Sequence, residues 1–322
     1  MKLSIIIVNW NVRENIINCL ESIKENPPRE EFETIVVDNG SNDGSISAIK
    51  DNFPDVTIIA NSDNRGFAAA NNQGINKSQG QYILMLNPDT IVHPGSLDKL
   101  INFMQENKDI GICGPRILND DGTIQASVRH LPTFRAALYR NTIFRALGVF
   151  RKNYQRYVMA DFRYDRQMDV DHVKGAAMMT RRAAMEKVGG MDEKFFMCYE
   201  EFDFCLRVKQ AGWRVVFTPE ISITHFGARS ASQIPIELRA MSIESMLKYF
   251  RKHRGTLSTG LFSVVFKLAV LLRHVNNFIV AVPTYAVATV LSDHRRQQKA
   301  ITKIRNSAVW LRRYSWPLLF EM

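Results

Sequence analysis

Tyr82-Ile-Leu-Met-Leu86 is an unbroken run of largely apolar residues that leads directly into the triplet Asn87-Pro-Asp89. Two earlier stretches have the same form: Leu3 to Val8 is almost wholly apolar, and Thr34 to Val37 runs into Asp38. Such runs are typical of strands that are covered on both faces of a parallel sheet. Because the carboxyl ends of neighbouring parallel strands meet in one crevice, the sequence predicts an α/β fold with polar residues gathered at one sheet edge.

Helical patterns separate these runs. Ile16, Leu20 and Ile23 recur at helical spacing, and Pro27-Pro28 ends that pattern, so the first unit reads as a right-handed βαβ crossover. Residues 126–170 show weak periodicity and predict long loops with short helices. We also expect strands at 56–59, 110–113, 173–180, 214–218 and 221–224, and helices at 67–75, 94–105, 183–188 and 202–211.

Charge is unevenly distributed along the 322 residues. The net charge is +10, and residues 251–322 hold 12 Lys/Arg against 2 Asp/Glu, which leaves 30 against 30 in residues 1–250. The neutral first part and the apolar tail disfavour nucleic acid as a partner. The four cysteines form no C-x-x-C pair, and no signal-peptide pattern opens the chain, so we expect a cytoplasmic protein.

The tail is amphipathic. Leu257, Leu261, Val264, Leu268, Leu271 and Val275 form a helical stripe, with Ser263, Lys267 and His274 opposite. The longest stretch without a charged residue or histidine, Val275 to Ser292, is marginal for a membrane span, which needs roughly 20 apolar residues. Basic residues from Arg295 to Arg313 follow it. We expect domains at 1–245 and 246–322, the second a helical extension that lies on the anionic inner face of the cell membrane. A spanning helix and a helix packed on the core remain alternatives.

Asp89 and His225 are the candidate metal ligands. A strand that ends in Asn87-Pro-Asp89 can hold a divalent ion through one carboxylate, and Mg²⁺ usually binds one or two carboxylates together with substrate phosphates. His225 follows another β-branched run; taken alone it fits a core histidine, but beside a metal-binding carboxylate it is a plausible second ligand. These residues indicate a metal-assisted enzyme that acts on a phosphorylated ligand.

Glu200, Glu201 and Asp203 form an acidic cluster at a predicted helix start. Acids there offset the helix dipole, and Asp203 can pair with Arg207 at i, i+4. Three acids exceed what capping needs. Glu201 shares one helical face with Cys205 and Val208, which would aim it toward the sheet crevice, where a raised pKa suits a general base, whereas Glu200 falls on the more polar side.

A nicotinamide enzyme is excluded at its most diagnostic point. A dinucleotide-binding fold carries G-x-G-x-x-G in its first strand-to-helix turn, but here that turn, Val8-Asn-Trp-Asn-Val12, has no glycine.

Several motifs resemble those of family 2 glycosyltransferases of the GT-A fold, and most closely their rhamnosyltransferase-like branch. The resemblance covers roughly residues 3–230 and is carried by motifs in the family's order: Ser4-Ile-Ile-Ile-Val-Asn-Trp-Asn11, Val36-Val-Asp-Asn-Gly-Ser-Asn-Asp-Gly-Ser45, Asn64-Arg-Gly-Phe-Ala-Ala-Ala-Asn-Asn-Gln-Gly74, Leu86-Asn-Pro-Asp89, Lys174-Gly-Ala176 and Gly189-Gly-Met-Asp-Glu-Lys-Phe-Phe196 through Tyr199-Glu-Glu-Phe-Asp-Phe-Cys-Leu-Arg207.

The resemblance implies a Rossmann-like, mostly parallel sheet flanked by helices, and an inverting transfer from a nucleotide-diphosphate sugar. Asn87-Pro-Asp89 stands at the family's D-x-D metal motif, so Asp89 carries most of the binding of Mg²⁺ or Mn²⁺, and His225 matches the metal-binding histidine. Glu201 matches the general base, with Glu200 and Asp203 as alternatives. The implied donor-binding residues are Asn9, Asp38, Arg65, Gly66, Asn71, Asn87 and Gly175.

The expected partners follow from the same resemblance. The donor is a dTDP- or UDP-sugar, with rhamnose favoured by the family alone, and the acceptor is a glycan or a polyprenyl-diphosphate-linked sugar of a bacterial surface polysaccharide. Two alternative functions remain: a glycoside hydrolase, which also uses two carboxylates, and a non-catalytic membrane-associated sugar-binding protein.

Overall fold

The computed structural model describes residues 1–227 and 233–316, and the chain packs as two compact units. The sheet unit comprises Met1–Leu131 and Asp161–Pro235, and the helical unit comprises Pro132–Ala160 and Ile236–Met322. The boundary expected after residue 245 falls inside a continuous helix, α9 (Pro235–Arg254). The packing divides the chain near Pro235 instead, and it adds a segment from the middle of the sequence to the helical unit.

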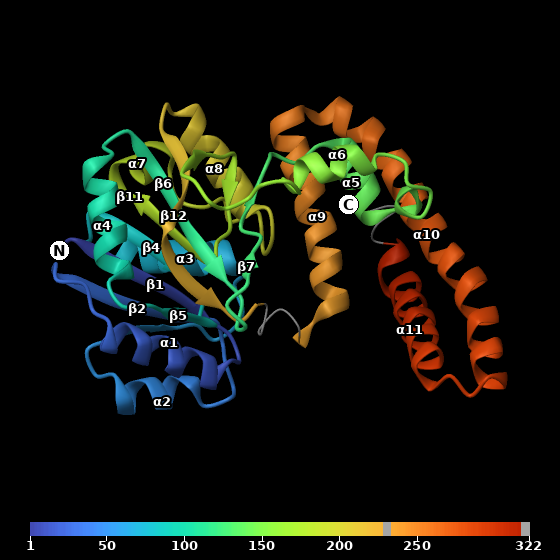
Figure 1. Ribbon diagram of the computed structural model, residues 1–322, viewed down its shortest axis with the longest axis horizontal. Helices are drawn as coiled ribbons and strands as arrows, with labels where there is room; N and C mark the ends of the chain where they lie inside the picture. The colour runs from blue at the N-terminus through green and yellow to red at the C-terminus, as the bar shows by residue number, and fades with distance from the viewer. Residues whose placement is uncertain (228–232, 317–322) are drawn as a thin grey trace. The chain divides into compact units, whose positions relative to one another are not determined.

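The sheet unit is built on one mixed sheet with the strand order β3-β2-β1-β4-β11-β6-β12-β5 (Figure 1). β1 is parallel to β2 and to β4, and β2 is parallel to β3. β11 and β5 run antiparallel to their neighbours, as the expected mostly parallel sheet allows. The strands are β1 (Leu3–Asn9), β2 (Phe32–Asp38), β3 (Thr57–Ala60), β4 (Tyr82–Leu86), β5 (Thr90–Val92), β6 (Ile110–Leu118), β11 (Ala177–Arg181) and β12 (Arg214–His225).

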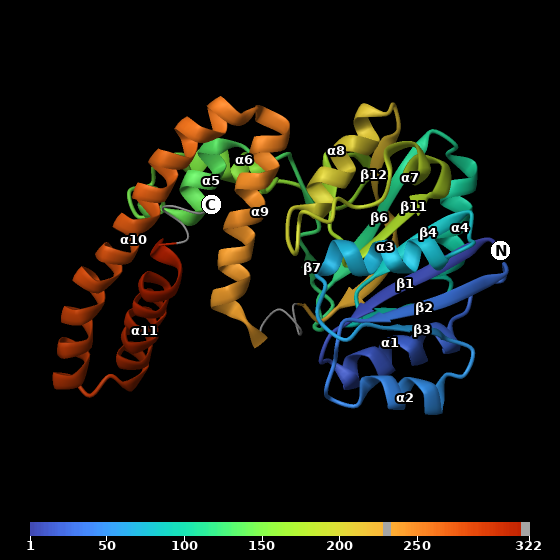
Figure 2. The same ribbon diagram turned by 180° about the vertical axis from the view of Figure 1, so that it is seen from behind.

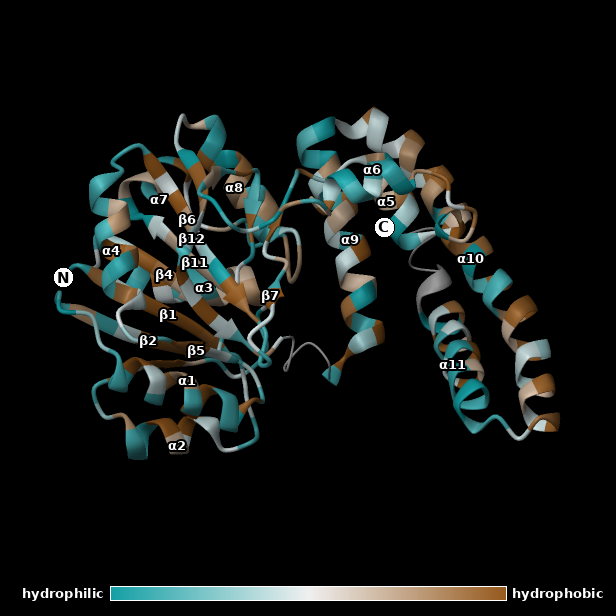
Figure 3. Ribbon diagram, in the orientation of Figure 1, coloured by the Kyte–Doolittle hydropathy of each residue, from teal (hydrophilic) through white to brown (hydrophobic). Residues whose placement is uncertain are grey.

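Helices cover both faces of this sheet, which explains the apolar strands (Figures 2 and 3). α1 (Arg13–Glu25), α2 (Ser45–Asn52) and α4 (Ser96–Glu106) share one core with alternate residues of β1 and β4. α3 (Phe67–Lys77) packs on the other face beside Val8 and Val37. α7 (Arg182–Val188) and α8 (Glu200–Gln210) contact β6 at Gly111, where a Cβ would lie 2.8 Å from Val208.

Two expected strand boundaries were wrong. The expected strand at 173–180 is split into β10 (His172–Val173) and β11, because β10 pairs with β8 (Val128–Arg129) in a separate two-stranded sheet, whereas β11 pairs with β4 in the main sheet. The expected strands at 214–218 and 221–224 are one strand, β12, with an irregular register between Thr218 and Ser222 that accommodates Pro219-Glu220. The short strands β7 (Ile124–Gln125), β8 (Val128–Arg129) and β9 (Met168–Asp169) complete the unit.

The helical unit contains α5 (Phe134–Asn141), the 3₁₀ turn η1 (Ile143–Arg145), α6 (Arg151–Tyr157), α9, α10 (Thr256–Val290) and α11 (His294–Trp316). Short helices were therefore correctly expected within 126–170. An aromatic cluster forms its core: Phe134 stacks on Phe262 with ring centroids 4.3 Å apart, and Phe250 meets both rings edge-on. His274 stacks on Trp310 at 4.2 Å and joins α10 to α11.

The apolar stripe of α10 lies on its exposed side. Leu257, Leu261, Val264 and Leu268 are 57–80% exposed, whereas His274, expected on the polar side, is 3% exposed. The expected amphipathic helix is present, but the face that is buried lies opposite the apolar stripe and is lined by Phe262 and its aromatic neighbours. α10 is long and apolar enough to cross a membrane by length and composition, with 28% of its most apolar window buried. Figure 3 shows hydrophobic colour along α10 and hydrophilic colour along α11.

Candidate active site

The polar ends of three strands meet at one edge of the sheet, as the sequence predicts. Asn9 ends β1 and pairs in register with Asp38, which ends β2. Asn87 follows β4, the parallel neighbour of β1 on its other side. The backbone N–H of Asn87 donates to Ala176 O at 3.0 Å, which brings the segment before β11 to the same edge.

Asn9 and Asp38 form the first part of the site. Both side chains are fully buried, and Asn9 Nδ2 donates to Asp38 Oδ2 at 2.8 Å and to Ser41 Oγ at 3.2 Å. The backbone N–H of Ser41 donates to the other carboxylate oxygen of Asp38 at 2.8 Å. Asn9 Oδ1 is buried without a hydrogen-bond partner. Asn9 Oδ1 is thus an unsatisfied acceptor that is buried at the sheet edge.

Gly66 holds the loop before α3 in a conformation that other residues rarely adopt. Its φ is +86°, and a Cβ there would lie 2.4 Å from Phe196 O. Asn39 Nδ2 donates to Gly66 O at 3.1 Å, so this loop is tied to the end of β2. The neighbouring Arg65 is exposed, with Nε 3.9 Å from Asp63 Oδ1. Asn71 differs from the other donor-binding candidates, because its amide donates to Phe67 O within α3 at 2.9 Å.

Asp89 and His225 lie together, with Asp89 Oδ1 3.2 Å from His225 Nε2 and both side chains at most 5% exposed. Their meeting follows from the strand pairing, because Thr90 of β5 is in register with His225 of β12. Asn87 Nδ2 also reaches His225 Nε2, at 3.2 Å. The structure thus brings the two expected metal ligands to one point.

Gln125 fixes which ring nitrogen of His225 carries the proton. Its amide nitrogen donates to His225 O at 3.1 Å and to Asn119 Oδ1 at 2.7 Å, so its oxygen must face the imidazole. His225 Nδ1 therefore donates to Gln125 Oε1, at 2.7 Å, and the lone pair of Nε2 faces Asp89.

This donor set fits a divalent cation. Two acceptor atoms, a carboxylate oxygen and an imidazole nitrogen, lie 3.2 Å apart, and the other ring nitrogen is held by a neighbouring side chain, as is usual for a ligating histidine. Among residues 1–227 and 233–316, no group of three or more His, Cys, Asp or Glu could hold a metal ion. The protein would thus supply two ligands and leave the remaining positions to a phosphorylated substrate and water.

Lys174 joins this point to the acidic cluster, and the sequence reasoning missed it. Its Nζ donates to Gln125 Oε1 at 2.5 Å and lies 3.3 Å from His225 Nδ1. Burial lowers the pKa of Lys174, and the carboxylates of Asp89 and Glu201 raise it, so its charge acts on both. Its position directly before Gly175 was the available signal.

Glu200 and Glu201 begin α8, after two residues with positive φ, Cys198 and Tyr199. Burial raises the pKa of Glu201, while the backbone N–H of Gly175 and the charge of Lys174 lower it. A Cβ on residue 175 would lie 2.8 Å from Glu201 Oε1, so a larger residue there would displace this carboxylate. Glu201 is partly exposed, as a group that meets a substrate must be.

The helical pattern predicted that Glu200 lies on the more polar side of α8, but in the structure it does not. It is 3% exposed, and its Oε2 has no hydrogen-bond partner. Burial and the neighbouring Glu201 raise the pKa of Glu200 well above its ordinary value. The pattern was misleading because it considers only the other residues of the same helix. Glu200 is buried by other parts of the folded chain that surround the start of α8.

Asp203 is held in the structural pair that the sequence offered as an alternative. It is fully buried, and Arg207 Nε donates to its Oδ2 at 2.7 Å. Arg207 also donates to the carbonyls of Val188, Gly189 and Gly190, and so fixes the loop after α7.

Comparison with known proteins identifies the family of the chain. Residues 4–188 match the family model described as Glycosyl transferase family 2. The chain is 29% identical over 214 residues to N-acetylglucosaminyl-diphospho-decaprenol L-rhamnosyltransferase of Mycobacterium tuberculosis, which covers 62% of this chain and 68% of that protein. It is 30% identical over 214 residues to a low-salt glycan biosynthesis hexosyltransferase of Haloferax volcanii, covering 65% of this chain and 62% of that protein.

Solved structures show the same fold. A mannosyltransferase from Pyrobaculum calidifontis, in complex with GDP-Man and Mn²⁺, superposes with a TM-score of 0.57 at 16% identity and covers 99% of this chain and 87% of that one. GalNAc-T7 with UDP, GalNAc and Mn²⁺ gives a TM-score of 0.53 at 16% identity, over 70% of this chain and 44% of that one. The fold is GT-A, and the family match covers more than half of the chain. The chain therefore belongs to glycosyl transferase family 2.

Proposed function

We propose that the protein is an inverting glycosyltransferase that moves a sugar from a nucleotide-diphosphate donor to a hydroxyl group of a glycan or lipid-linked acceptor. One observation carries the proposal: Asp89 Oδ1 lies 3.2 Å from His225 Nε2, and the adjacent residues Lys174 and Gly175 lie between this pair and Glu201. A cation-binding pair and a partly exposed carboxylate therefore share one sheet edge.

Asp89 and His225 would hold Mg²⁺ or Mn²⁺. When bound, the ion supplies positive charge that neutralises the donor diphosphate and stabilises its departure. Asn9 and Asp38 present buried acceptors at the ends of β1 and β2, suited to hydroxyl and N–H groups of the nucleoside. Gly66 and Arg65 lie on the loop tied to Asn39, directly after Asp38.

Glu201 would take the proton of the acceptor hydroxyl. A base must be ionised to act, and the N–H of Gly175 together with the Lys174 ammonium favours its carboxylate form against the effect of burial. One displacement on the anomeric carbon inverts its configuration. Glu200 remains the second candidate, because it is adjacent and its Oε2 has no partner, whereas Asp203 is committed to Arg207.

The relatives favour a rhamnosyl group and a lipid-linked acceptor. The Mycobacterium tuberculosis relative is named for transfer of L-rhamnose to N-acetylglucosaminyl-diphospho-decaprenol. We therefore place dTDP-rhamnose first among the donors and UDP-sugars second, with a polyprenyl-diphosphate-linked sugar as the acceptor in surface polysaccharide synthesis.

The helical unit would hold the enzyme on the cytoplasmic face of the cell membrane. The exposed apolar residues of α10 and the basic residues of α11 together fit an interface between acyl chains and anionic headgroups. His274 is buried against Trp310 of α11, which favours a helix pair lying on the membrane over a single crossing helix.

The test is release of nucleoside diphosphate from dTDP-rhamnose, UDP-sugars and GDP-mannose, with a polyprenyl-diphosphate GlcNAc acceptor and with Mn²⁺ or EDTA. We expect acceptor-dependent release that Mn²⁺ restores after EDTA. Sugar released from an oligosaccharide without a nucleotide donor would indicate a glycoside hydrolase. Donor binding without any release in all conditions would indicate a sugar-binding protein.

A further inference from the structure

The helical unit carries a large excess of positive charge that it does not neutralise itself. Its two segments hold 20 Lys/Arg against 4 Asp/Glu, a net charge of +16, and residues 132–160 contain no acid at all. Its acidic residues form ion pairs with other basic residues of the same unit, apart from Glu321, which lies outside the described residues. The engaged acids are Glu237 with Arg313 at 2.9 Å, Glu244 with Lys248 at 2.7 Å, and Asp293 with Arg296 at 3.2 Å.

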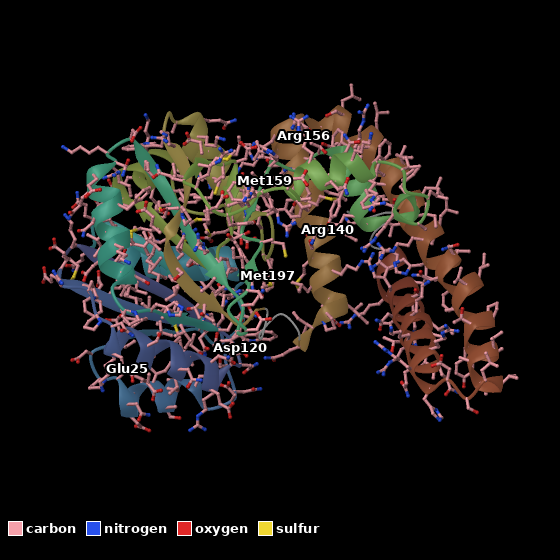
Figure 4. All side chains as sticks on the ribbon, in the orientation of Figure 1. Glu25, Asp120, Arg140, Arg156, Met159 and Met197 are labelled. Carbon is pink, nitrogen blue, oxygen red and sulfur yellow. The ribbon has the colours of Figure 1, made fainter. Side chains whose placement is uncertain are left out.

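Four arginines from four elements of this unit come together. They are Arg140 of α5, Arg145 of η1, Arg239 of α9 and Arg273 of α10. Arg239 and Arg273 are half-buried, and Arg145 is exposed, so the cluster is open to solvent on one side. Figure 4 labels Arg140 in the helical unit.

Hydrogen bonds to the last carbonyls of α5 hold two of these side chains in place. One nitrogen of Arg239 donates to Asn141 O at 3.4 Å, and one nitrogen of Arg273 donates to Arg140 O at 3.2 Å. Each guanidinium has five N–H donors in a fixed fork, so these hydrogen bonds use only a minority of them.

The structure offers too little negative charge to balance the cluster. The carboxyl end of a helix such as α5 is equivalent to only about half an elementary charge. Among the described residues, no carboxylate forms an ion pair with Arg145, Arg239 or Arg273. Burial, and after it the charges of the neighbouring arginines, lower the pKa of Arg239 to about 10. Half-buried like charges of this kind are costly without a counter-ion.

We propose that Arg145, Arg239 and Arg273 form a binding site for a phosphate or diphosphate group, with Arg140 beside it. A guanidinium fork binds phosphate oxygens through paired, charge-assisted hydrogen bonds, and three such forks near the end of α5 suit an anion with several oxygens. An anion there supplies the missing negative charge.

The inference adds an anion site to the proposed function. It depends on that function only for the source of the anion. The same chemistry is offered by the diphosphate of a lipid-linked acceptor, by the headgroup of a bilayer phospholipid and by free pyrophosphate. Anion binding itself follows from the charge balance of the helical unit and needs no transfer reaction.

The experiment measures binding to the full chain in EDTA, so that the Asp89–His225 site contributes no metal-bridged phosphate. The probes are inorganic pyrophosphate, farnesyl diphosphate in neutral phosphatidylcholine nanodiscs, and vesicles that contain phosphatidylglycerol. We expect at least one probe to bind and to raise the melting temperature. Preference for farnesyl diphosphate assigns a lipid diphosphate, preference for the vesicles assigns a bilayer headgroup, and equal binding of pyrophosphate assigns a free anion.

The variants are Arg239→Gln with Arg273→Gln, and the matched control is Arg254→Gln, an exposed cation at the end of α9. The double variant should weaken the binding of that probe by about 10-fold or more, whereas the control should change it by less than about 2-fold. Without ligand the double variant should melt no lower than the wild type, because it loses repulsion. Nucleotide binding to the sheet unit serves as an independent check on the proposed function.

No binding of any probe by the wild type would overturn the inference, whether or not the variants fold. Binding that Arg254→Gln weakens as much as the double variant would also overturn it, since general charge would then explain the affinity.

Discussion

Asp89 Oδ1 lies 3.2 Å from His225 Nε2, although 136 positions separate the two residues in the sequence. The antiparallel pairing of β5 with β12 produces this contact, because it sets Thr90 opposite His225. Gln125 then directs the Nε2 lone pair toward the carboxylate by accepting from Nδ1. The pair is therefore arranged by the fold before any ligand arrives, which makes its parts separately testable.

Replacing Gln125 with Leu should weaken divalent-ion binding. The substitution removes the acceptor that His225 Nδ1 and Lys174 Nζ share, so the imidazole loses its fixed orientation. Loss of such an outer partner costs about 10- to 100-fold in metal affinity. Titration with Mn²⁺, followed by its electron paramagnetic resonance signal, measures the change directly. Unchanged Mn²⁺ affinity would show that Gln125 does not orient a metal ligand.

Replacing Glu201 with Gln should reduce turnover by about 10²- to 10⁴-fold, the usual contribution of a general base. Donor affinity should stay nearly constant, because Glu201 is assigned to the acceptor proton. Steady-state release of nucleoside diphosphate gives turnover, and a thermal-shift titration gives donor affinity. Glu186→Gln, an exposed residue of α7, is the matched control and should retain wild-type turnover. Wild-type turnover by Glu201→Gln would transfer the role to Glu200.

The fold and most of the site could be predicted because both depend on local patterns. Continuous apolar runs marked β1, β2 and β4, and the rule that parallel strands end at one edge placed Asp38 and Asp89 together. Lys174 was marked only by its position directly before Gly175, and Gln125 carries no local signal. Gln125 lies on a two-residue strand, and its contact with His225 depends on how β6, β7 and β12 pair.

The exposed stripe of α10 could not be assigned to one environment for a related reason. A helical period shows that Leu261 and Leu268 share a face, but it does not show whether protein or lipid covers that face. The buried side of α10 is set by aromatic residues such as Phe262, whose partner Phe134 lies far away in the sequence.

Replacing Glu200 with Gln should make the protein more stable, and increasingly so as pH rises. The pKa of Glu200 is raised in the folded state, so the wild type has its full stability below the unfolded-state pKa and loses it as pH rises through the folded-state pKa. Each unit of the shift corresponds to about 1.4 kcal/mol. Glutamine does not titrate, so the difference in melting temperature between variant and wild type should grow from about pH 4.5 upward. A constant difference across that range would mean that Glu200 titrates normally.

Replacing Asp203 with Asn should destabilise the fold by about 3 kcal/mol, because it leaves the mostly buried Arg207 without its counter-charge. Chemical denaturation measures the loss. Turnover per folded molecule should remain within a few-fold of wild type, since Asp203 supports the loop through Arg207 and does not meet a substrate. A stable variant with strongly reduced turnover would instead place Asp203 in the catalytic machinery.

Replacing Leu261 and Leu268 with Gln should weaken binding to vesicles without changing the melting temperature. The two side chains are 68% and 57% exposed, so they contribute little to packing within the helical unit. On a membrane each would bury apolar surface worth roughly 25 cal/mol per Å², and losing both should reduce the partition constant by about 10-fold or more. Co-sedimentation with vesicles that contain phosphatidylglycerol measures this constant. Ile124→Gln, which replaces a 45% exposed residue of the sheet unit, is the control and should leave the constant unchanged.

High salt should weaken binding further, because basic residues of α11 contribute about 1 kcal/mol each near anionic headgroups. If the double variant partitions like the wild type, the α10 stripe is not the membrane contact.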